Sequence, residues 1–359
     1  MAILAVPLSV AADSNSRAER LEKILSGLVS PREPGAAVLV AKDGRVVFER
    51  GYGITDLRTL RPIDGRTNFR LASVTKQLTA AAVMLLVRDG KLHFDDRLTS
   101  IFPGFPPYGA NILIRHLLNH TSGLPDYENL MPPPSAGTPG GQSQISDLDV
   151  LELLKRQVAG KFLPGSKWDY SNSGYVVLGL IVEKASGLPF GRFLRDRIFL
   201  PLKMDRTLAY ERGKNEVPDR AFGHSKESGI WRETDQSPTS ATLGDGGVYS
   251  SLEDMAKWDA ALRDHSLLDA AAMKEALTPV VLADSPPTEP GGAPAAYGFG
   301  WFLNPWKGHA RAWHYGETEG FRTAIQRFVD DGLTVVVLCN RADADAPGLA
   351  LKAAGLFLE

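Results

Sequence analysis

Apolar and polar residues alternate in short segments at both ends of the chain, and this period of two predicts β-strands. Two strands are expected near the N-terminus, at 36–41 and 45–52, joined by the hairpin signal Lys42-Asp43-Gly44. Strand patterns return toward the C-terminus at 297–303, 310–315, 321–328 and 333–340. Short turns such as Asp330-Asp331-Gly332 favour an antiparallel order.

Helical spacing of apolar residues fills much of the remaining sequence. Helices are expected at about 16–28, from Ser73 to Val87, and at 344–358, while 92–240 is mainly helical with long loops. Segments rich in Pro and Gly predict surface loops at 131–143 and 284–295. The predicted fold class is α/β (α+β), an antiparallel sheet flanked by helices with an inserted mainly helical lobe. The sheet domain would comprise 13–91 and 241–359, the lobe 92–240, and residues 1–12 are interpreted as a leader remnant.

The first candidate for chemistry is the tetrad Ser73-Val74-Thr75-Lys76 at the head of a strongly apolar helix, which Gly90 is suited to end. Residues three apart on a helix are neighbours, so Ser73 and Lys76 should touch. A desolvated lysine has a lowered pKa and can accept a serine proton, which would make Ser73 a nucleophile. The alternative is a helix cap at Ser73 with Lys76 reaching solvent.

The second candidate is Tyr170-Ser171-Asn172, after the Pro164-Gly165 turn and before an apolar helix-like run. Tyr170 and Asn172 are expected on a loop. There a lysine ammonium would ease ionisation of Tyr170, so that the tyrosine could act as a base. An ordinary polar turn is the alternative. Tyr127-Glu128-Asn129 has the same spacing without the turn and the helix, so Tyr127 is interpreted only as a pocket wall.

The third candidate is His314-Tyr315-Gly316-Glu317, flanked by strand-like segments. Gly316 on a strand would allow a substrate backbone to approach closely. His314 would donate to a carboxylate or polarise a carbonyl. The alternative is a packed, hydrogen-bonded core histidine.

These motifs in this order resemble the serine β-lactamase and penicillin-binding superfamily. The resemblance is narrower to the class C β-lactamase-related group, which includes D-aminopeptidases, family VIII esterases and CubicO hydrolases. It extends from about Ala36 to the C-terminus and also rests on the segments 117–124, 164–175, 246–251 and 335–341. It implies Ser73 as the acylated nucleophile, Lys76 as its proton partner and Tyr170 as the general base. Asn172 would hold the substrate, and the backbone N–H groups of Ser73 and Glu317 would form the oxyanion hole.

The resemblance also shows one departure from the family pattern. His314 stands where β-lactamases and penicillin-binding proteins usually carry lysine, which weakens the fixed charge that grips a substrate carboxylate. The implied function is a serine hydrolase acting through an acyl-enzyme on ester, amide or β-lactam carbonyls, more esterase-like or peptidase-like than β-lactamase. The alternative is a penicillin-binding or sensor protein that does not turn over. Small esters, β-lactams or D-amino-acid peptides are the implied partners, and no cofactor or metal is implied.

Composition limits the remaining classes of function. A net charge of −2 gives no basic footprint for nucleic acid, and no apolar run reaches the ~20 residues of a membrane span. Cys339 is the only cysteine and is expected to be a buried structural thiol. His116 and His120 have the spacing of metal ligands on a helix, but the glutamate of H-E-x-x-H is absent, which favours a structural pair. The apolar 1–12 segment predicts a periplasmic or secreted protein, with a cytoplasmic location as the alternative.

Overall fold

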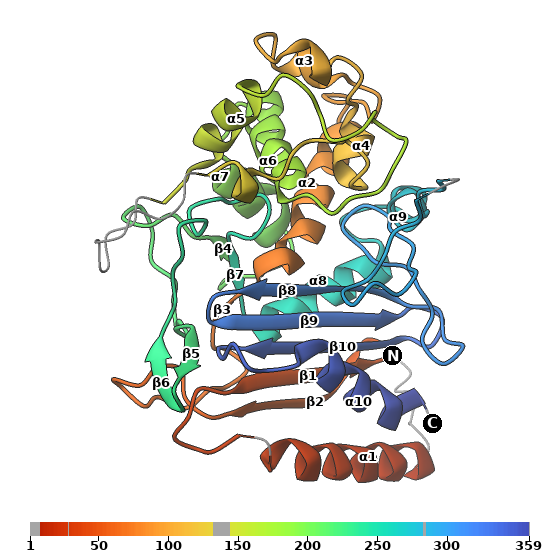
Figure 1. Cartoon of the computed structure of the whole chain (residues 1–359). Helices are drawn as coiled ribbons and strands as arrows, with labels where there is room; N and C mark the ends of the chain where they lie inside the picture. The colour runs from red at the N-terminus through yellow and green to blue at the C-terminus, as the bar shows by residue number, and fades with distance from the viewer. Residues whose placement is uncertain (1–7, 28, 132–143, 283–284, 359) are drawn as a thin grey trace.

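A five-stranded antiparallel sheet in the order β2-β1-β10-β9-β8 forms the centre of the computed structural model (Figure 1). The structure describes residues 8–27, 29–131, 144–282 and 285–358. The strands are β1 (Ala36–Lys42), β2 (Arg45–Tyr52), β8 (Ala312–Thr318), β9 (Phe321–Phe328) and β10 (Leu333–Cys339). The first and last parts of the chain therefore meet in one sheet, with Val38 opposite Val337. The predicted fold class and antiparallel order are confirmed.

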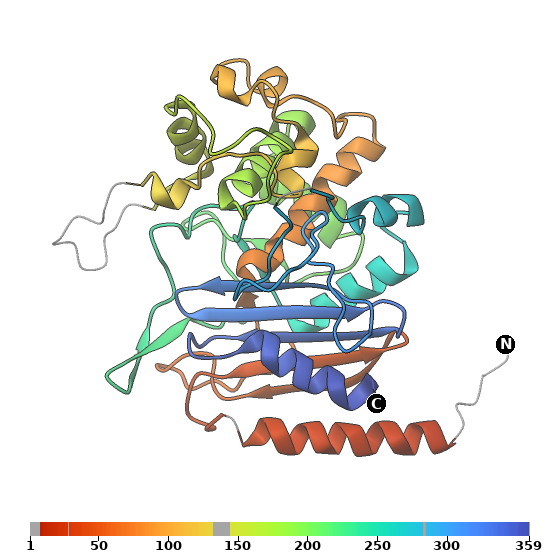
Figure 2. The same ribbon diagram turned by 45° about the vertical axis from the view of Figure 1, so that its right-hand side comes forward.

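Each face of this sheet is buried by a different set of helices. In β1, Val38 and Val40 pack with α1 (Leu8–Ser26) and α10 (Ala346–Leu358), which lie on the outer face (Figure 2). Ala37 and Leu39 point the other way and join the core formed with α2 (Lys76–Arg88) and α8 (Leu252–Asp264). This alternation follows from the period of two that defines a strand.

A helical layer covers the β8 edge of the sheet (Figure 1). Here α2 packs against α6 (Asn172–Ser186); α2 is almost wholly buried, and α6 is buried from Ser173 to Val182. The other elements of this layer are α3 (Leu98–Ile101), η2 (Pro107–Gly109), α4 (Ile114–Leu118), η3 (Tyr127–Asn129), α5 (Asp147–Lys155), α7 (Phe190–Leu194) and the π-helical turn η4 (Arg195–Phe199).

Two smaller sheets accompany the main sheet. One small sheet joins β3 (Phe69–Arg70), β7 (Val248–Ser250) and β4 (Leu208–Ala209), and a hairpin joins β5 (His224–Glu227) to β6 (Ile230–Glu233). The helix α9 (Ala270–Ala276) and the 3-10 helix η1 (Ala72–Thr75) complete the set. The segment 92–240, predicted as mainly helical, therefore has a strand-containing second half. The predicted domain boundaries stay a prediction.

Several predicted elements differ from those observed. The expected strand at 297–303 is not formed: Phe302 makes isolated bridges to Tyr297, across a tight turn in which Gly300 has φ +78°, and to Trp313 of β8. A side chain at Gly300 would press on the backbone of Lys76, so this segment turns against the start of α2 instead of extending along the sheet. The first helix begins at Leu8 instead of 16, within the segment interpreted as a leader, whose residues 1–7 lie outside the described part.

The loops and the buried thiol agree with the sequence. Residues 285–295 are irregular and mostly exposed, while 132–143 of the other predicted loop lie outside the described residues. Cys339 is buried in β10, and burial raises the pKa of its thiol to about 12. None of the described helices is both long and apolar enough to cross a membrane.

Candidate active site

Ser73 and Lys76 lie where the chain leaves β3 and enters α2. The structure brings them together: Lys76 Nζ donates to Ser73 Oγ over 2.9 Å. The predicted α-helix begins at Lys76, not at Ser73, because Ala72 adopts φ +48° and a 3-10 turn precedes α2. Ser73 is thus presented from a tight turn at the head of a buried helix, and its side chain remains partly exposed.

The Lys76 ammonium is fully buried yet has three hydrogen-bond acceptors. Besides Ser73, its Nζ donates to Asn172 Oδ1 over 2.9 Å and to the Asp245 carbonyl over 3.0 Å. Burial lowers its pKa to about 8, against the attraction of nearby carboxylates. Near neutral pH a useful fraction of Lys76 is therefore an uncharged amine next to the Ser73 hydroxyl. The helix-cap alternative, with Lys76 in solvent, is wrong.

Tyr170 and Asn172 approach from the opposite side of the site. Tyr170 lies on a loop as predicted, with Ser73 as a hydrogen-bond partner and its ring 4.9 Å from Lys76 Nζ. Asn172 is the first residue of α6 and not a loop residue, because Ser171 caps this helix. Burial raises the pKa of Tyr170, and the carboxylates of Asp245 and Asp126 raise it further, so the predicted easier ionisation of Tyr170 is not found and its hydroxyl is neutral.

Strand β8 passes directly alongside the Ser73 turn. A Cβ at Gly316 would lie 2.2 Å from the Leu71 carbonyl oxygen and 3.0 Å from Ser73 N, so only glycine fits there. The glycine therefore allows strand β8 to approach the backbone of the protein itself at the Ser73 turn. Glu317 is exposed, lies 3.8 Å from Arg322, and lines the same pocket as Ser73.

The pocket beside Ser73 measures about 50 Å³ and is lined by Tyr127 as well. The interpretation of Tyr127 as a pocket wall agrees with this position. Its ring is buried, and its hydroxyl donates to Asp245 Oδ2 over 3.1 Å. Asp245 and Glu128, whose carboxylate accepts from Asn172 Nδ2 over 3.2 Å, are site residues that the sequence analysis missed. Glu128 belongs to Tyr127-Glu128-Asn129, the second segment with Y-x-N spacing, and this motif is the sequence feature that could have indicated Glu128 as a site residue.

His314 is part of a chain of hydrogen bonds behind Tyr170. Its Nδ1 lies 2.6 Å from the Tyr315 carbonyl and its Nε2 lies 3.0 Å from Tyr297 Oη. Tyr297 Oη also lies 3.1 Å from His120 Nε2, and His120 Nδ1 accepts from Ser171 N over 3.2 Å. Burial lowers the pKa of His314 to about 3 and that of His120 well below its ordinary value, so both rings are neutral.

The groups at the two ends of this series of hydrogen bonds, the Ser171 N–H and the Tyr315 carbonyl, determine which atoms carry the protons. A backbone N–H can only donate and a carbonyl can only accept, while a neutral imidazole has one donor and one acceptor. His314 Nδ1–H therefore donates to the Tyr315 carbonyl, and Tyr297 O–H donates to His314 Nε2. Then His120 Nε2–H donates to Tyr297 Oη. The expected donor or cation at His314 is thus a neutral ring whose nitrogens are both occupied by protein groups.

The positions of His116 and His120 argue against the alternative that these two residues bind a metal together. The helix α4 ends at Leu118, and His120 has φ +60°, so the two rings do not share a helix face. His116 Nδ1 instead accepts from Leu113 N over 3.2 Å. No group of three or more potential ligands that could hold a metal occurs among the described residues.

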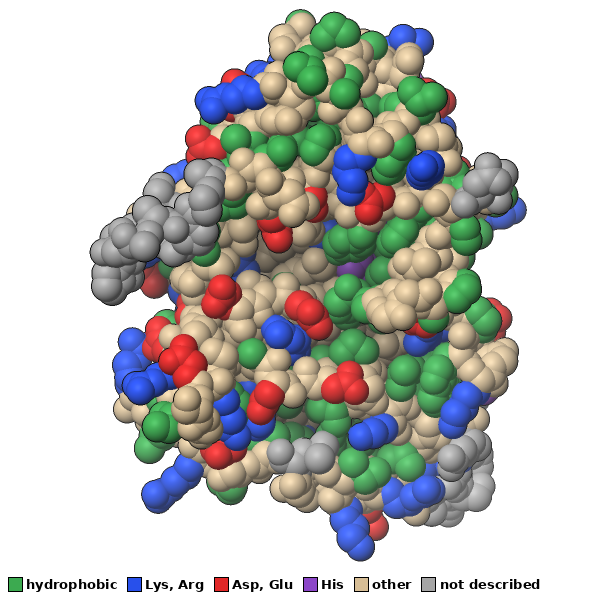
Figure 3. All heavy atoms as spheres, viewed as in Figure 1, with side chains coloured by type: hydrophobic (Ala, Val, Ile, Leu, Met, Phe, Trp, Pro, Cys, Tyr) green, Lys and Arg blue, Asp and Glu red, His purple; other side chains and the backbone are tan. Residues whose placement is uncertain are grey.

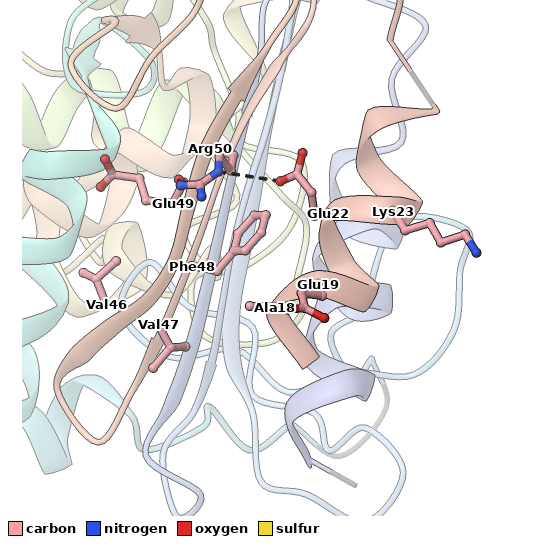
Figure 4. Close-up of a pocket in the computed structure, with 9 residues that line it drawn as sticks. All are labelled: Ala18, Glu19, Glu22, Lys23, Val46, Val47, Phe48, Glu49 and Arg50. Carbon is pink, nitrogen blue, oxygen red and sulfur yellow. Dashed lines mark hydrogen bonds and ion pairs between the residues drawn. The ribbon is translucent and has the colours of Figure 1, made fainter. Parts of the chain in front are cut away.

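A larger cavity, of about 860 Å³, lies between α1 and β2 at the opposite edge of the sheet (Figure 4). Its lining includes the ion pair of Arg50 with Glu22, 3.6 Å apart, and apolar side chains such as Phe48. It has no serine, cysteine or histidine in its lining. The smaller pocket beside Ser73 is therefore the candidate active site.

Comparison with known proteins agrees with this geometry. The Beta-lactamase family model matches residues 21–356. This chain belongs to the β-lactamase family. It is 32% identical to penicillin-binding protein 4* of Bacillus subtilis (strain 168), covering 94% of this chain and 75% of that protein. It is 30% identical to a D-aminopeptidase of Cereibacter sphaeroides, over 90% of this chain.

The chain spans about 60% of the length of that D-aminopeptidase. Among solved structures it resembles the D-amino acid amidase from Ochrobactrum anthropi SV3, with a TM-score of 0.79, 27% identity and 97% of each chain covered. EstCE1, a hydrolase with promiscuous acyltransferase activity, has the same fold with a TM-score of 0.79 at 22% identity.

Proposed function

We propose that this protein is a serine hydrolase that cleaves ester or amide carbonyls through an acyl-enzyme on Ser73. The observation that carries the proposal is the 2.9 Å contact between Ser73 Oγ and the buried Lys76 Nζ. A buried lysine without a partner or role is rare, and its pKa of about 8 supplies an uncharged amine at the nucleophile.

In this mechanism the neutral Lys76 amine takes the Ser73 proton while Oγ attacks the carbonyl carbon. The backbone N–H groups of Ser73 and Glu317 would stabilise the oxyanion. The Tyr170 hydroxyl is neutral and hydrogen-bonded to Ser73. It gives a proton to the leaving group and regains one from Lys76. Water then attacks the carbonyl carbon of the acyl-enzyme and gives a proton to Lys76 or Tyr170. The bond from this carbon to Ser73 Oγ breaks, Oγ regains a proton from the same two residues, and the carboxylic acid leaves.

Asn172 has a supporting role in this scheme. Its Oδ1 is held by Lys76 and its Nδ2 by Glu128, which fixes the amide in one orientation. It keeps the Lys76 amine aimed at Ser73 and offers a polar edge to the substrate. His314, held by Tyr297 and the Tyr315 carbonyl, supplies no positive charge, which favours esterase or peptidase-like action over efficient β-lactamase action.

The first experiment is turnover of p-nitrophenyl acetate by the wild type, Ser73→Ala and Ser100→Ala. Ser100 is an exposed serine of α3, outside the pocket, and serves as the matched control. We expect kcat to fall ~10³-fold or more in Ser73→Ala and in Lys76→Ala, and somewhat less in Tyr170→Phe, without additivity. Equal rates in the wild type and Ser73→Ala would end the proposal.

The alternative is a penicillin-binding or sensor protein, favoured by the family and by the small pocket. It predicts a stable adduct of a labelled penicillin on Ser73 without release and no ester turnover. For location, we propose the periplasm or secretion, with the cytoplasm as the alternative, and N-terminal sequencing of the protein from its native host tests this.

A further inference from the structure

A further cavity is separate from the pocket beside Ser73. That pocket lies in the hollow between the helical layer and the sheet, where acidic side chains gather (Figure 3). The further cavity measures about 230 Å³ and lies at the end of the sheet where β9 turns into β10, between this turn, α8 and α9 (Figure 1). No residue lines both, so the reaction proposed at Ser73 does not use the further cavity.

Apolar side chains form much of the wall of this cavity. They are Leu262 of α8, Met273 and Leu277 at the end of α9, and Phe328 and Leu333 on either side of the β9–β10 turn. All except the half-buried Leu277 are buried. A cavity of about 150 Å³ with apolar walls is large enough for benzene. This one therefore has room for an aromatic ring or a short aliphatic chain.

A buried arginine forms a polar part of the wall. Arg327 of β9 is 6% exposed, and its Nε donates to Asp259 Oδ1 over 2.8 Å. The same oxygen accepts from Thr334 Oγ1 over 2.7 Å, so three elements hold the guanidinium by its Nε edge. Its Nη1 and Nη2 have no hydrogen-bond partner within the described residues. Four N–H donors of a buried group are therefore available to a ligand.

The charges of the lining determine what this ligand is. Two cations, Arg327 and Arg263, and one carboxylate, Asp259, line the cavity, so a net positive charge remains. The two Nη groups of an arginine match the two oxygens of a carboxylate.

We infer that this cavity binds a monocarboxylate with an apolar body of about six carbons, whose carboxylate is held by Arg327 Nη1 and Nη2. The apolar body would pack against the side chains from α8, α9 and the β9–β10 turn. Acids of this class are also what hydrolysis of an apolar ester releases. The site does not depend on the proposed function, because it contains no residue of the cleavage machinery.

Arg327 also has a simpler role, which is to pair with Asp259 inside the protein. Two substitutions separate the roles. Leu277→Trp fills the cavity from its half-buried side and leaves the ion pair in place. Arg327→Lys keeps a cation beside Asp259 but replaces the two-nitrogen fork with one ammonium. A pairing role alone predicts that neither substitution affects a ligand.

The test is calorimetric titration with hexanoate, hexanamide and acetate. Each compound is titrated into the wild type, Leu277→Trp, Arg327→Lys and two matched controls, Val281→Trp and Arg197→Lys. Val281 is 88% exposed, and Arg197 donates to Asp89 over 2.6 Å; neither lines the cavity. Thermal unfolding shows that each variant is folded, and either cavity variant alone decides the result.

We expect hexanoate to bind the wild type with a Kd of about 1 mM or lower, as a ligand of eight non-hydrogen atoms can. Hexanamide, which lacks the charge, and acetate, which lacks the apolar body, should bind at least ~10-fold more weakly. Leu277→Trp should remove hexanoate binding and Arg327→Lys should weaken it ~10-fold, with both controls like the wild type. No binding to the wild type, equal binding to Leu277→Trp, or equal affinity for hexanoate and hexanamide overturns the inference.

Discussion

Replacing Lys76 by methionine isolates the cost of burying its charge. The ordinary lysine pKa of 10.5 falls to about 8 in the folded protein, with burial as the largest cause. Between these two values the unfolded chain binds more protons than the folded one, so wild-type stability rises with pH across this window. At 1.36 kcal/mol per pKa difference of one, the gain from pH 7 to pH 10 is roughly 2 to 3 kcal/mol.

Lys76→Met has no ionisable group at this position, so its free energy of unfolding should not show the rise between pH 7 and pH 10 that Lys76 causes. At pH 7 the variant is relieved of the buried charge but loses three hydrogen bonds worth about 1 kcal/mol each, so the two proteins should be of similar stability. At pH 10 the wild type should be the more stable by roughly 2 to 3 kcal/mol.

The measurement is the free energy of unfolding in urea at pH 7, 8, 9 and 10 for both proteins. Tyrosines, other lysines and Cys339 titrate in both, so the difference between the two curves isolates Lys76. A difference that stays constant within ~0.5 kcal/mol, about the error of such extrapolations, would show that the pKa of Lys76 is not lowered. A difference of opposite sign would show that the pocket favours the charged amine.

The remaining predictions concern the same site. The kcat/KM of the wild type should rise about tenfold from pH 7 to pH 9, following the neutral fraction of Lys76, and a flat or falling profile would exclude the amine as base. Tyr297→Phe should lower kcat ~10- to 100-fold and alter the ¹⁵N chemical shifts that report histidine tautomers. The control Tyr108→Phe removes a hydroxyl that donates to the Leu154 carbonyl, and it should leave both unchanged. Gly316→Ala should abolish turnover because its Cβ meets backbone beside the nucleophile; Gly104→Ala, with open space around its Cβ, should be active, and an active Gly316→Ala would refute this close contact.

Local periodicity explains which parts of the fold the sequence could predict. The alternation in 36–41 and 45–52 and the buried pattern after Ser73 each depend on a few consecutive residues, and the observed strands and helix follow them closely. The contact of Ser73 with Lys76 depends on a spacing of three, which survives the change from α-helix to 3-10 turn.

Contacts between distant segments explain what the sequence could not predict. The 297–303 segment alternates like a strand, but Gly300 turns it against the start of α2, a partner more than two hundred residues away. The motif order indicates that Lys76 lies beside Tyr170 and so predicts a lowered pKa for Tyr170, whereas burial raises this pKa. The burial of Tyr170 was not visible, because that arises from packing against His120 and Trp168.

The histidine at position 314 shows why a residue type in a motif does not give its role. The sequence indicated a weaker cation in place of lysine. The hydrogen bonds with Tyr297 and the Tyr315 carbonyl occupy both ring nitrogens, and burial keeps the ring neutral. A ring without charge cannot attract a substrate carboxylate. The pocket beside Ser73 is lined by three carboxylates, Glu128, Asp245 and Glu317, and by Arg70, whose guanidinium donates to the Gly246 and Ser240 carbonyls. The side chains of this lining are therefore mostly opposite in charge to the lysine of a lysine-bearing site.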